Sequence, residues 1–293
     1  FGRRLRLTNL DKVLFPARDG EAPVTKRDLV RYAAQIAPVV LPYLHGRALN
    51  MHRYPDGAQG KGFWHKQLPS HAPGWVGRWD NPDATPARRP PTSSSTSRPP
   101  SSGRPTSARS SGTPGRRARP SRTCDVRADR HRPRHVDAVG GRPGPRPSAP
   151  GRVRAPGVRA QPKLTGRRGI QVWVPIATGP TFDETRAWVE TLSRTVGKVV
   201  PDIVSWRWEV RERGGQARLD YTQNAINKTL VAPYSPRAAA GAPVSAPITW
   251  EELDEPWLRP DAFTVRTILD RLAERGDPFR AVLATDQILP RLH

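Results

Sequence analysis

Three short segments of this chain carry side chains that could do chemistry on a bound ligand. Asp220 interrupts the apolar positions 217, 219 and 221 of a predicted strand, so its carboxylate faces away from them and is either solvated or a ligand. Residues 62–66, Gly-Phe-Trp-His-Lys, place two rings beside a cation, and one ring is expected to be exposed. Residues 165–169, Thr-Gly-Arg-Arg-Gly, suit a ligand-binding loop and an exposed basic turn equally.

Predicted helices and strands surround these segments. Thr25 is a helix cap with Asp28 at the third position, and the apolar stripe that follows ends before Pro38. The stripe consists of Leu29, Tyr32, Ala33 and Ile36. A second helix is predicted over 182–197, with Trp188, Val189, Leu192 and Val196 buried. Strands are predicted at 48–54, 170–174, 206–210 and 217–221, the last two joined in a hairpin by Gly214-Gly215.

Residues 85–156 differ in composition from both flanks. They consist almost wholly of Arg, Pro, Ser, Thr, Gly and Ala, and they contain no Leu, Ile, Phe, Trp, Tyr or Met. A segment with so little to bury cannot offset the entropy of ordering its backbone, so it is expected to be disordered and to form no core. The chain therefore divides into an N-terminal part, 1–84, this basic block, 85–156, and a C-terminal part, 157–293.

The block also carries most of the net charge. It holds 17 Arg and 3 Asp, a net of +14, which leaves +9 of the total +23 for the other 221 residues. A basic excess of that size favours a polyanionic partner such as nucleic acid. Cys124 is the single cysteine, so no disulfide framework exists, and no apolar run has membrane-spanning length. A cytoplasmic protein with no membrane partner is expected.

Two explanations of the block remain open. The first is a flexible basic linker or nucleic-acid-binding tail. The second is translation in a wrong frame, because the block uses the residues that GC-rich codons yield. Reading the codons of residues 129–135 one base later permits Ile-Asp-Ile-Asp-Pro-Gly, and an Asp-x-Asp on a strand followed by Pro-Gly is a metal-binding pattern.

Several motifs in the flanks resemble one protein family. They are residues 7–16 (LTNLDKVLFP), 53–57 (RYPDG), 219–224 (LDYTQN), 228–229 (KT) and 232–237 (APYSPR). In this order and spacing they resemble the polymerase domain of bacterial non-homologous end-joining ligases of the ligase D type, within the archaeo-eukaryotic primase superfamily. The shifted-frame Asp-x-Asp falls where that family carries its first two catalytic carboxylates.

The resemblance implies a fold and a reaction. The fold is α/β and primase-like, with an RRM-like catalytic sheet and an N-terminal αβ unit, interrupted by the basic block. The reaction is template-directed addition of nucleotides at broken DNA ends, with Mg²⁺ or Mn²⁺ held by three carboxylates. Implied partners are 5′-phosphorylated DNA ends, NTP or dNTP, a DNA ligase and an end-binding repair protein. A non-catalytic DNA-end-binding protein is the alternative.

The resemblance also assigns roles to single residues. Asp220 matches the third metal-binding carboxylate, and the first two are absent from this chain as written. Asn9, Lys12 and Lys26 match residues that bind the downstream 5′-phosphate. Phe63 and Trp64 match the pair that stacks on a template base, and Lys66 lies beside them. The residues that match the nucleotide pocket are Thr165, Arg168, Gln223 and Arg237, with Lys228 as an additional phosphate contact. Gln171 replaces a His found in many relatives, a departure that suggests a stand-alone or separate-ligase-associated branch.

Sequencing of the coding DNA distinguishes the two explanations of the block. The frameshift explanation predicts a pair of compensating insertions or deletions that bracket residues 85–156, with an Asp-x-Asp codon run between them. A reading frame without such a pair would leave the natural linker as the explanation.

Overall fold

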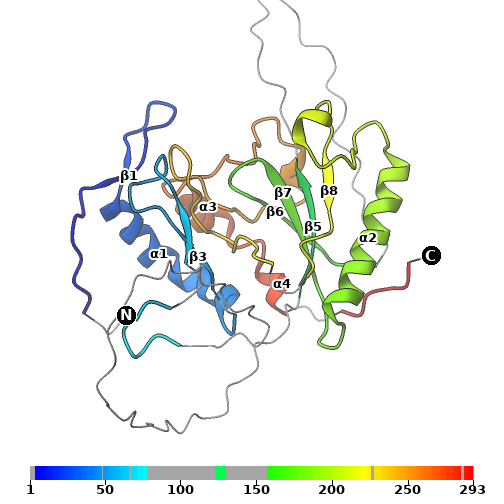
Figure 1. Cartoon of the computed structure of the whole chain (residues 1–293), viewed down its shortest axis with the longest axis horizontal. Helices are drawn as coiled ribbons and strands as arrows, with labels where there is room; N and C mark the ends of the chain where they lie inside the picture. The colour runs from blue at the N-terminus through cyan, green and yellow to red at the C-terminus, as the bar shows by residue number, and fades with distance from the viewer. Residues whose placement is uncertain are drawn as a thin grey trace, which may run out of the picture.

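The computed structural model describes residues 4–47, 49–65, 68–70, 72–77, 123–129, 157–225, 228–284 and 287–292; for residues 65, 123–129 and 210 it describes the backbone alone. These residues form an N-terminal unit and a four-stranded sheet with helices between and beside them (Figure 1). No helix within the described ranges has the length and apolar character needed to cross a membrane.

The N-terminal unit consists of one long helix and two small antiparallel ribbons. The helix is α1 (Lys26–Leu44), and the ribbons pair β1 (Val13–Phe15) with β2 (Val24–Thr25), and β3 (Met51–Arg53) with β4 (Phe63–His65). The predicted capping box is confirmed: the Thr25 hydroxyl accepts from the backbone N–H of Asp28, whose carboxylate accepts from the N–H of Thr25.

The apolar stripe of α1 does not end before Pro38, and that prediction was wrong. The helix continues through Pro38 and Pro42, both on its exposed side, to Leu44, and its buried face extends to Tyr43. A proline inside a helix costs a backbone hydrogen bond, so tertiary contacts must offset the loss. Tyr43 supplies them because it is 2% exposed and packs against Tyr234 and Phe279. Within the predicted stripe Tyr32 and Ile36 are buried, but Ala33 is exposed.

The central sheet has the order β6-β7-β5-β8, and all its pairs are antiparallel. Its strands are β6 (Gln161–Leu164), β7 (Gly169–Pro175), β5 (Thr123–Asp129) and β8 (Arg218–Asp220). Strand β7 has a core on each side: Trp173 joins the larger core with Leu164, whereas Val174 packs with Val189 of α2 (Phe182–Val199). Helix α2 lies along the β5–β8 side of the sheet (Figure 1).

Strand β5 is the main departure from the predicted organisation. It lies inside the basic block that was expected to form no core, yet its seven residues pair with β7, and three of them, 127–129, also pair with β8. The backbone hydrogen bonds of a central strand depend on its two neighbours rather than on large side chains. The rest of the block, 85–122 and 130–156, lies outside the described residues.

Two predicted details near β8 were also wrong. Residues 206–210 form no strand, and the segment continues instead into a 3₁₀ turn, η1 (Val210–Glu212). Because β8 pairs with β5, Gly214-Gly215 makes a turn but no hairpin between ladder partners. On α2, Val189 is buried as predicted, but Thr185, Ser193 and Gly197 share that face, whereas the other three predicted residues are half-buried.

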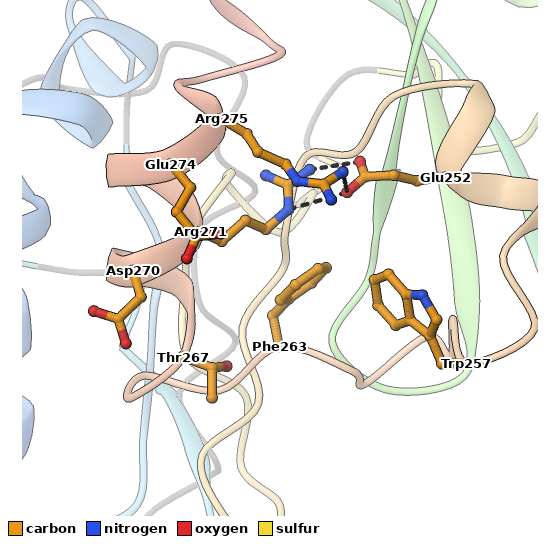
Figure 2. Close-up of a pocket in the computed structure, with 8 residues that line it drawn as sticks. All are labelled: Glu252, Trp257, Phe263, Thr267, Asp270, Arg271, Glu274 and Arg275. Carbon is orange, nitrogen blue, oxygen red and sulfur yellow. Dashed lines mark hydrogen bonds and ion pairs between the residues drawn. The ribbon is translucent and has the colours of Figure 1, made fainter.

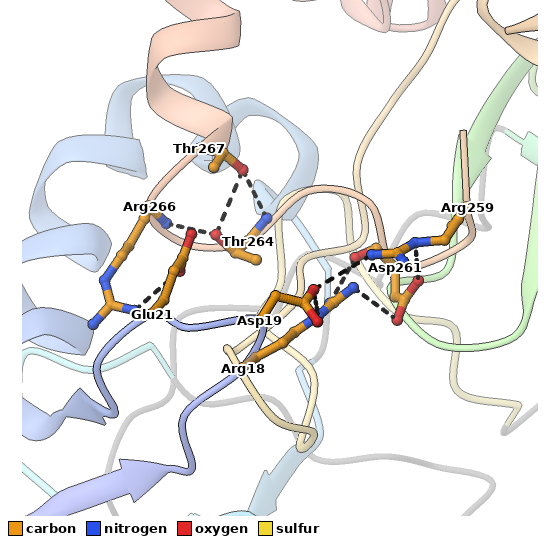
Figure 3. A network of polar contacts seen from close by, with 8 residues as sticks. All are labelled: Arg18, Asp19, Glu21, Arg259, Asp261, Thr264, Arg266 and Thr267. Carbon is orange, nitrogen blue, oxygen red and sulfur yellow. Dashed lines mark hydrogen bonds and ion pairs between the residues drawn. The ribbon is translucent and has the colours of Figure 1, made fainter. Parts of the chain in front are cut away.

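An ionic network fastens the N-terminal unit to the C-terminal part. Arg18 contacts the carboxylate of Asp261 at 3.2 Å and its carbonyl at 2.9 Å, and Arg259 lies 3.6 Å from Asp19 (Figure 3). Arg266 donates to the carbonyls of residues 22 and 23 beyond β1. The two segments are about 240 residues apart in sequence, so the network holds a non-local contact at the surface.

A buried polar hub reinforces this joint. The Asp277 carboxylate, between α3 (Ile268–Arg275) and α4 (Arg280–Ala284), accepts hydrogen bonds from the hydroxyls of Tyr43 and Tyr234, both at 2.6 Å. Burial, followed by the nearby carboxylate, raises the pKa of both tyrosines, so their hydroxyls remain donors. Tyr32 donates to the Tyr234 carbonyl at 2.6 Å, which adds a second link between α1 and the same segment.

Replacing Asp277 by Ala should therefore lower the free energy of unfolding by about 3 kcal/mol, because two buried hydroxyls lose their acceptor. Urea unfolding followed by circular dichroism measures the change. Asp270→Ala, on the exposed side of α3, is the matched control and should stay within about 0.5 kcal/mol. Equal losses in the two variants would contradict the importance of the hub.

Candidate nucleotide and DNA-end site

Asp220, at the end of β8, is a buried carboxylate with several donors. It is 8% exposed and accepts hydrogen bonds from the Thr222 backbone N–H at 3.1 Å, the Thr222 hydroxyl at 2.6 Å and the Gln223 amide at 3.2 Å. Burial alone would raise the pKa of Asp220, but these hydrogen bonds and the charge of Arg218 outweigh it and lower the pKa. The group is therefore an ionised carboxylate held in a fixed orientation.

The surroundings of Asp220 do not complete a metal centre. Arg127 is its Cα partner in β5, and Asp129 lies opposite Arg218. Strand β5 carries Asp125 and Asp129 four residues apart, rather than the two-residue spacing of an Asp-x-Asp. Among the side chains that the structure describes, no three His, Cys, Asp or Glu residues gather in a metal-binding group. The residues present therefore do not fit a pair of divalent cations, because one carboxylate cannot hold two.

The loop between β6 and β7 forms a second part of the site. The Thr165 hydroxyl accepts from the N–H of Gly169 at 3.1 Å, which closes the loop and leaves Arg168 exposed. Gly166 has φ +71°, and a Cβ there would lie 2.6 Å from Cγ of Arg237. The absence of a side chain at Gly166 thus lets Arg237 pack against the loop, which brings Thr165, Arg168 and Arg237 into one region.

Gln171 and Lys163 lie next to this loop. Gln171 is 2% exposed on β7, and its Cα partners are Lys163 in β6 and Arg127 in β5. Sequence reasoning missed Lys163, which is fully buried and donates to the Ser245 hydroxyl at 2.6 Å. A fully buried ammonium group beside this loop is unusual. Its place in the short segment Gln-Pro-Lys-Leu gave no sign in the sequence that it would be buried.

The predicted phosphate-binding residues lie together in the N-terminal unit. Asn9 has φ +53° and opens a turn in which Lys12 N–H donates to its carbonyl. Lys12 Nζ donates to the Pro55 carbonyl at 2.7 Å, and Lys26 Nζ donates to the Thr8 carbonyl at 2.7 Å. The two ammonium groups are held only by backbone oxygens and, for Lys12, by Asp56 at 3.7 Å. Such partners can be exchanged for a phosphate.

The β3–β4 ribbon exposes both of its predicted stacking residues. Phe63 is 47% exposed and Trp64 is 50% exposed, so the expectation of a single exposed ring was wrong. His52 stacks on Trp64 with ring centroids 4.3 Å apart, and the Arg53 guanidinium lies 5.9 Å from the Phe63 ring. A two-stranded ribbon has no core on either face here, which explains why adjacent rings can both face solvent. Lys66 lies outside the described residues.

Lys228 and its neighbour connect these regions. Lys228 is exposed, and the Thr229 hydroxyl accepts from the Asn50 amide at 3.0 Å, just before β3. The structure thus brings together Asp220 with Gln223, Thr165 with Arg237, and Lys12 with Lys26, whose backbone N–H donates to the Lys12 carbonyl at 2.8 Å. Among the described contacts, none joins these two lysines, predicted to bind phosphate, to Asp220.

One pocket of the described residues lies away from these groups. It has a volume of about 270 Å³ and is lined by η2 (Glu251–Asp254), α3 and the rings of Trp257 and Phe263 (Figure 2). Arg271 pairs with Glu252 inside it at 2.5 Å and lies over the Phe263 ring. This buried ion pair marks a structural site rather than part of the nucleotide region.

The fold is that of a primase-like polymerase domain. It is similar to the polymerase domain of Mycobacterium tuberculosis ligase D, solved in complex with DNA, with a TM-score of 0.69 and 24% identity over 97% of this chain and 99% of that one. This likeness confirms the predicted α/β, primase-like fold class.

Sequence comparison gives the family. The model of the LigD primase-polymerase domain matches residues 25–96 and 151–279, and the chain belongs to that family. The resemblance read from the motifs is thereby confirmed.

Relatives in the same family are multidomain proteins. The chain is 27% identical to the bifunctional non-homologous end joining protein LigD of Bacillus subtilis over 94% of its own length and 44% of that protein. It is also 27% identical to the multifunctional LigD of Mycolicibacterium smegmatis over 94% of its length and 35% of that protein. It therefore spans less than half of these relatives. The family match omits residues 97–150, which fall within the basic block.

The hydrogen bonds from Thr222 should set the ionisation of Asp220. Thr222→Val removes the 2.6 Å hydroxyl contact and leaves burial in place, so the pKa of Asp220 should rise. Because the pKa of Asp220 is lower in the folded state than in the unfolded chain, its carboxylate stabilises the fold above about pH 4, and this stabilisation is lost as the pH falls. The variant should lack this contribution to the free energy of unfolding. Carboxyl carbon NMR titration measures the pKa directly. Thr191→Val, on an exposed face of α2, should leave it unchanged.

Proposed function

We propose that this chain descends from a DNA-repair polymerase and primase that adds nucleotides at broken DNA ends in non-homologous end joining. The observation that carries the proposal is that Asn9 and Lys12 of the first turn lie beside Lys26, the first residue of α1, next to a ribbon that presents two aromatic rings. Paired ammonium groups suit a terminal phosphate, and exposed rings suit any unpaired base. Membership of the LigD primase-polymerase family supports the same function.

The nucleotide would occupy the region between the 165–169 loop and Asp220. Arg168 and Arg237 offer guanidinium groups to a triphosphate, with Lys228 as an additional cation. The Thr165 hydroxyl shapes the loop through Gly169, and Gln223 orients the Asp220 carboxylate. Both NTP and dNTP fit these contacts, since none of them distinguishes the sugar.

The proposed reaction of the lineage needs a pair of divalent cations such as Mg²⁺ or Mn²⁺, and the side chains that the structure describes do not fit such a pair. Arg127, the register partner of Asp220 in β5, offers no carboxylate there. We therefore propose that the polypeptide as written binds DNA ends but does not extend them, and that a shifted reading of residues 129–135 restores the missing carboxylates.

A non-catalytic DNA-end-binding protein is the second candidate. The cation opposite Asp220 favours it, together with phosphate-binding lysines that need no metal. Under this alternative the basic block adds salt-sensitive affinity for DNA. A DNA ligase and an end-binding repair protein are the proposed partners under both candidates.

End recognition can be tested by replacing Lys12. Lys12→Ala should weaken binding to a 5′-phosphorylated duplex by about tenfold and binding to the 5′-hydroxyl duplex far less, because a charge-assisted contact is lost only with the phosphate. Fluorescence anisotropy with the two duplexes gives both affinities. Arg186→Ala removes the same charge from the exposed face of α2 and should not change the ratio. Equal losses for both duplexes in Lys12→Ala would refute end recognition.

A further inference from the structure

An exposed tryptophan next to β8 has a feature that neither the fold nor the proposed site explains. Trp208 is 66% exposed, and the guanidinium carbon of Arg218 lies 3.9 Å from its ring centroid. Since a cation covers one face of the indole, so large an exposed fraction means that the other face and the edge are open. Trp206, two residues earlier, is 41% exposed, with Arg194 at 5.1 Å from its ring.

The loop that carries Trp208 is held in place from inside. Arg213 is 5% exposed, and it donates to the carbonyl of Arg207 at 3.0 Å and to that of Trp208 at 2.6 Å. The backbone of Ser205 donates to the Ala217 carbonyl at 2.8 Å, which ties the start of the loop to the strand before Arg218. A large apolar ring on a fixed backbone loses little conformational entropy when it binds a ligand.

The position of this ring relates it to the candidate site. Arg218 lies two residues before Asp220 on β8, a backbone distance of about 7 Å. Strand β8 is the last in the sheet order, beside α2 (Figure 1), so the loop adjoins the end of the sheet that carries Asp220. A strand of nucleic acid placed at Asp220 would pass close to the Trp208 ring.

We propose that Trp208, backed by Arg218, is a stacking platform for an unpaired base of the DNA end, in addition to Phe63 and Trp64. This inference rests on the proposed function. The chemistry fits a base because a purine or pyrimidine can stack on the open indole face while the guanidinium remains on the other. Arg207 and Arg211 are both exposed on the same loop and turn, with Arg207 3.8 Å from Glu212, and their charge favours a polyanion over a purely apolar partner.

The test compares a duplex that has a short single-stranded 3′ overhang with a blunt duplex, both 5′-phosphorylated, by fluorescence anisotropy. Trp208→Ala should weaken binding to the overhang duplex by about 5- to 100-fold, the range of one lost base stack, and binding to the blunt duplex less than about twofold. Trp208→Phe should retain most of the affinity. Trp257→Ala removes a ring that is 50% exposed near the Glu252–Arg271 pair and should change neither affinity.

A salt series separates stacking from charge. The affinity of Trp208→Ala should fall with salt at the wild-type slope, because a lost stack releases no counterions, whereas Arg207→Ala should reduce the slope. Thermal unfolding followed by circular dichroism should give wild-type midpoints for Trp208→Ala, since the ring is exposed.

The outcomes distinguish this inference from the proposed function. If Lys12-dependent preference for 5′-phosphate persists while Trp208→Ala binds overhangs like the wild type, the platform is refuted and the proposed function stands. A change in oligomeric state without a change in overhang affinity would instead assign the ring to self-association and would also refute the platform. If the wild-type chain binds neither duplex, both the platform and the proposed function fail.

Discussion

The candidate site depends on one interaction, the pairing of β8 with β5. Asp220 is buried, ionised and supplied with donors by Thr222 and Gln223, but its strand has only three residues and its ladder runs to β5. Strand β5 comes from the basic block. The segment whose composition least resembles that of a folded domain therefore provides the strand next to Asp220. In this chain the residue opposite Asp220 is Arg127, which offers no carboxylate.

The proposed DNA-end contacts are independent of that pairing. Lys12 and Lys26 donate to backbone carbonyls of the N-terminal unit, and the aromatic ribbon is fixed by its own short ladder. The Arg18–Asp261 contact and the Asp277 hub hold this unit against the C-terminal part. Under the proposed function, end binding and chemistry can therefore be lost separately.

Features that depend on neighbouring residues could be predicted from the sequence, whereas features that depend on contacts between distant residues could not. The capping box at Thr25 and the alternation of β7 depend on neighbouring residues and were predictable from spacing. The passage of α1 through Pro38 depends on Tyr43 reaching Asp277, more than 200 residues away. Trp206 and Trp208 alternate like a strand, but no strand pairs with them. The role of residues 123–129 as a central strand follows from the ladders on either side, which their composition cannot encode.

The central claim is that this polypeptide lacks the paired acids needed beside Asp220. Primer extension on a gapped duplex, in which a recessed 3′ end faces a 5′-phosphorylated downstream strand across a short single-stranded template, with Mn²⁺ and NTP or dNTP, tests it directly. The purified chain should incorporate no more nucleotide than its Asp220→Ala variant, whereas a chain with residues 85–156 restored to the shifted frames should extend the primer. Robust, Asp220-dependent extension by the chain as written would contradict the account.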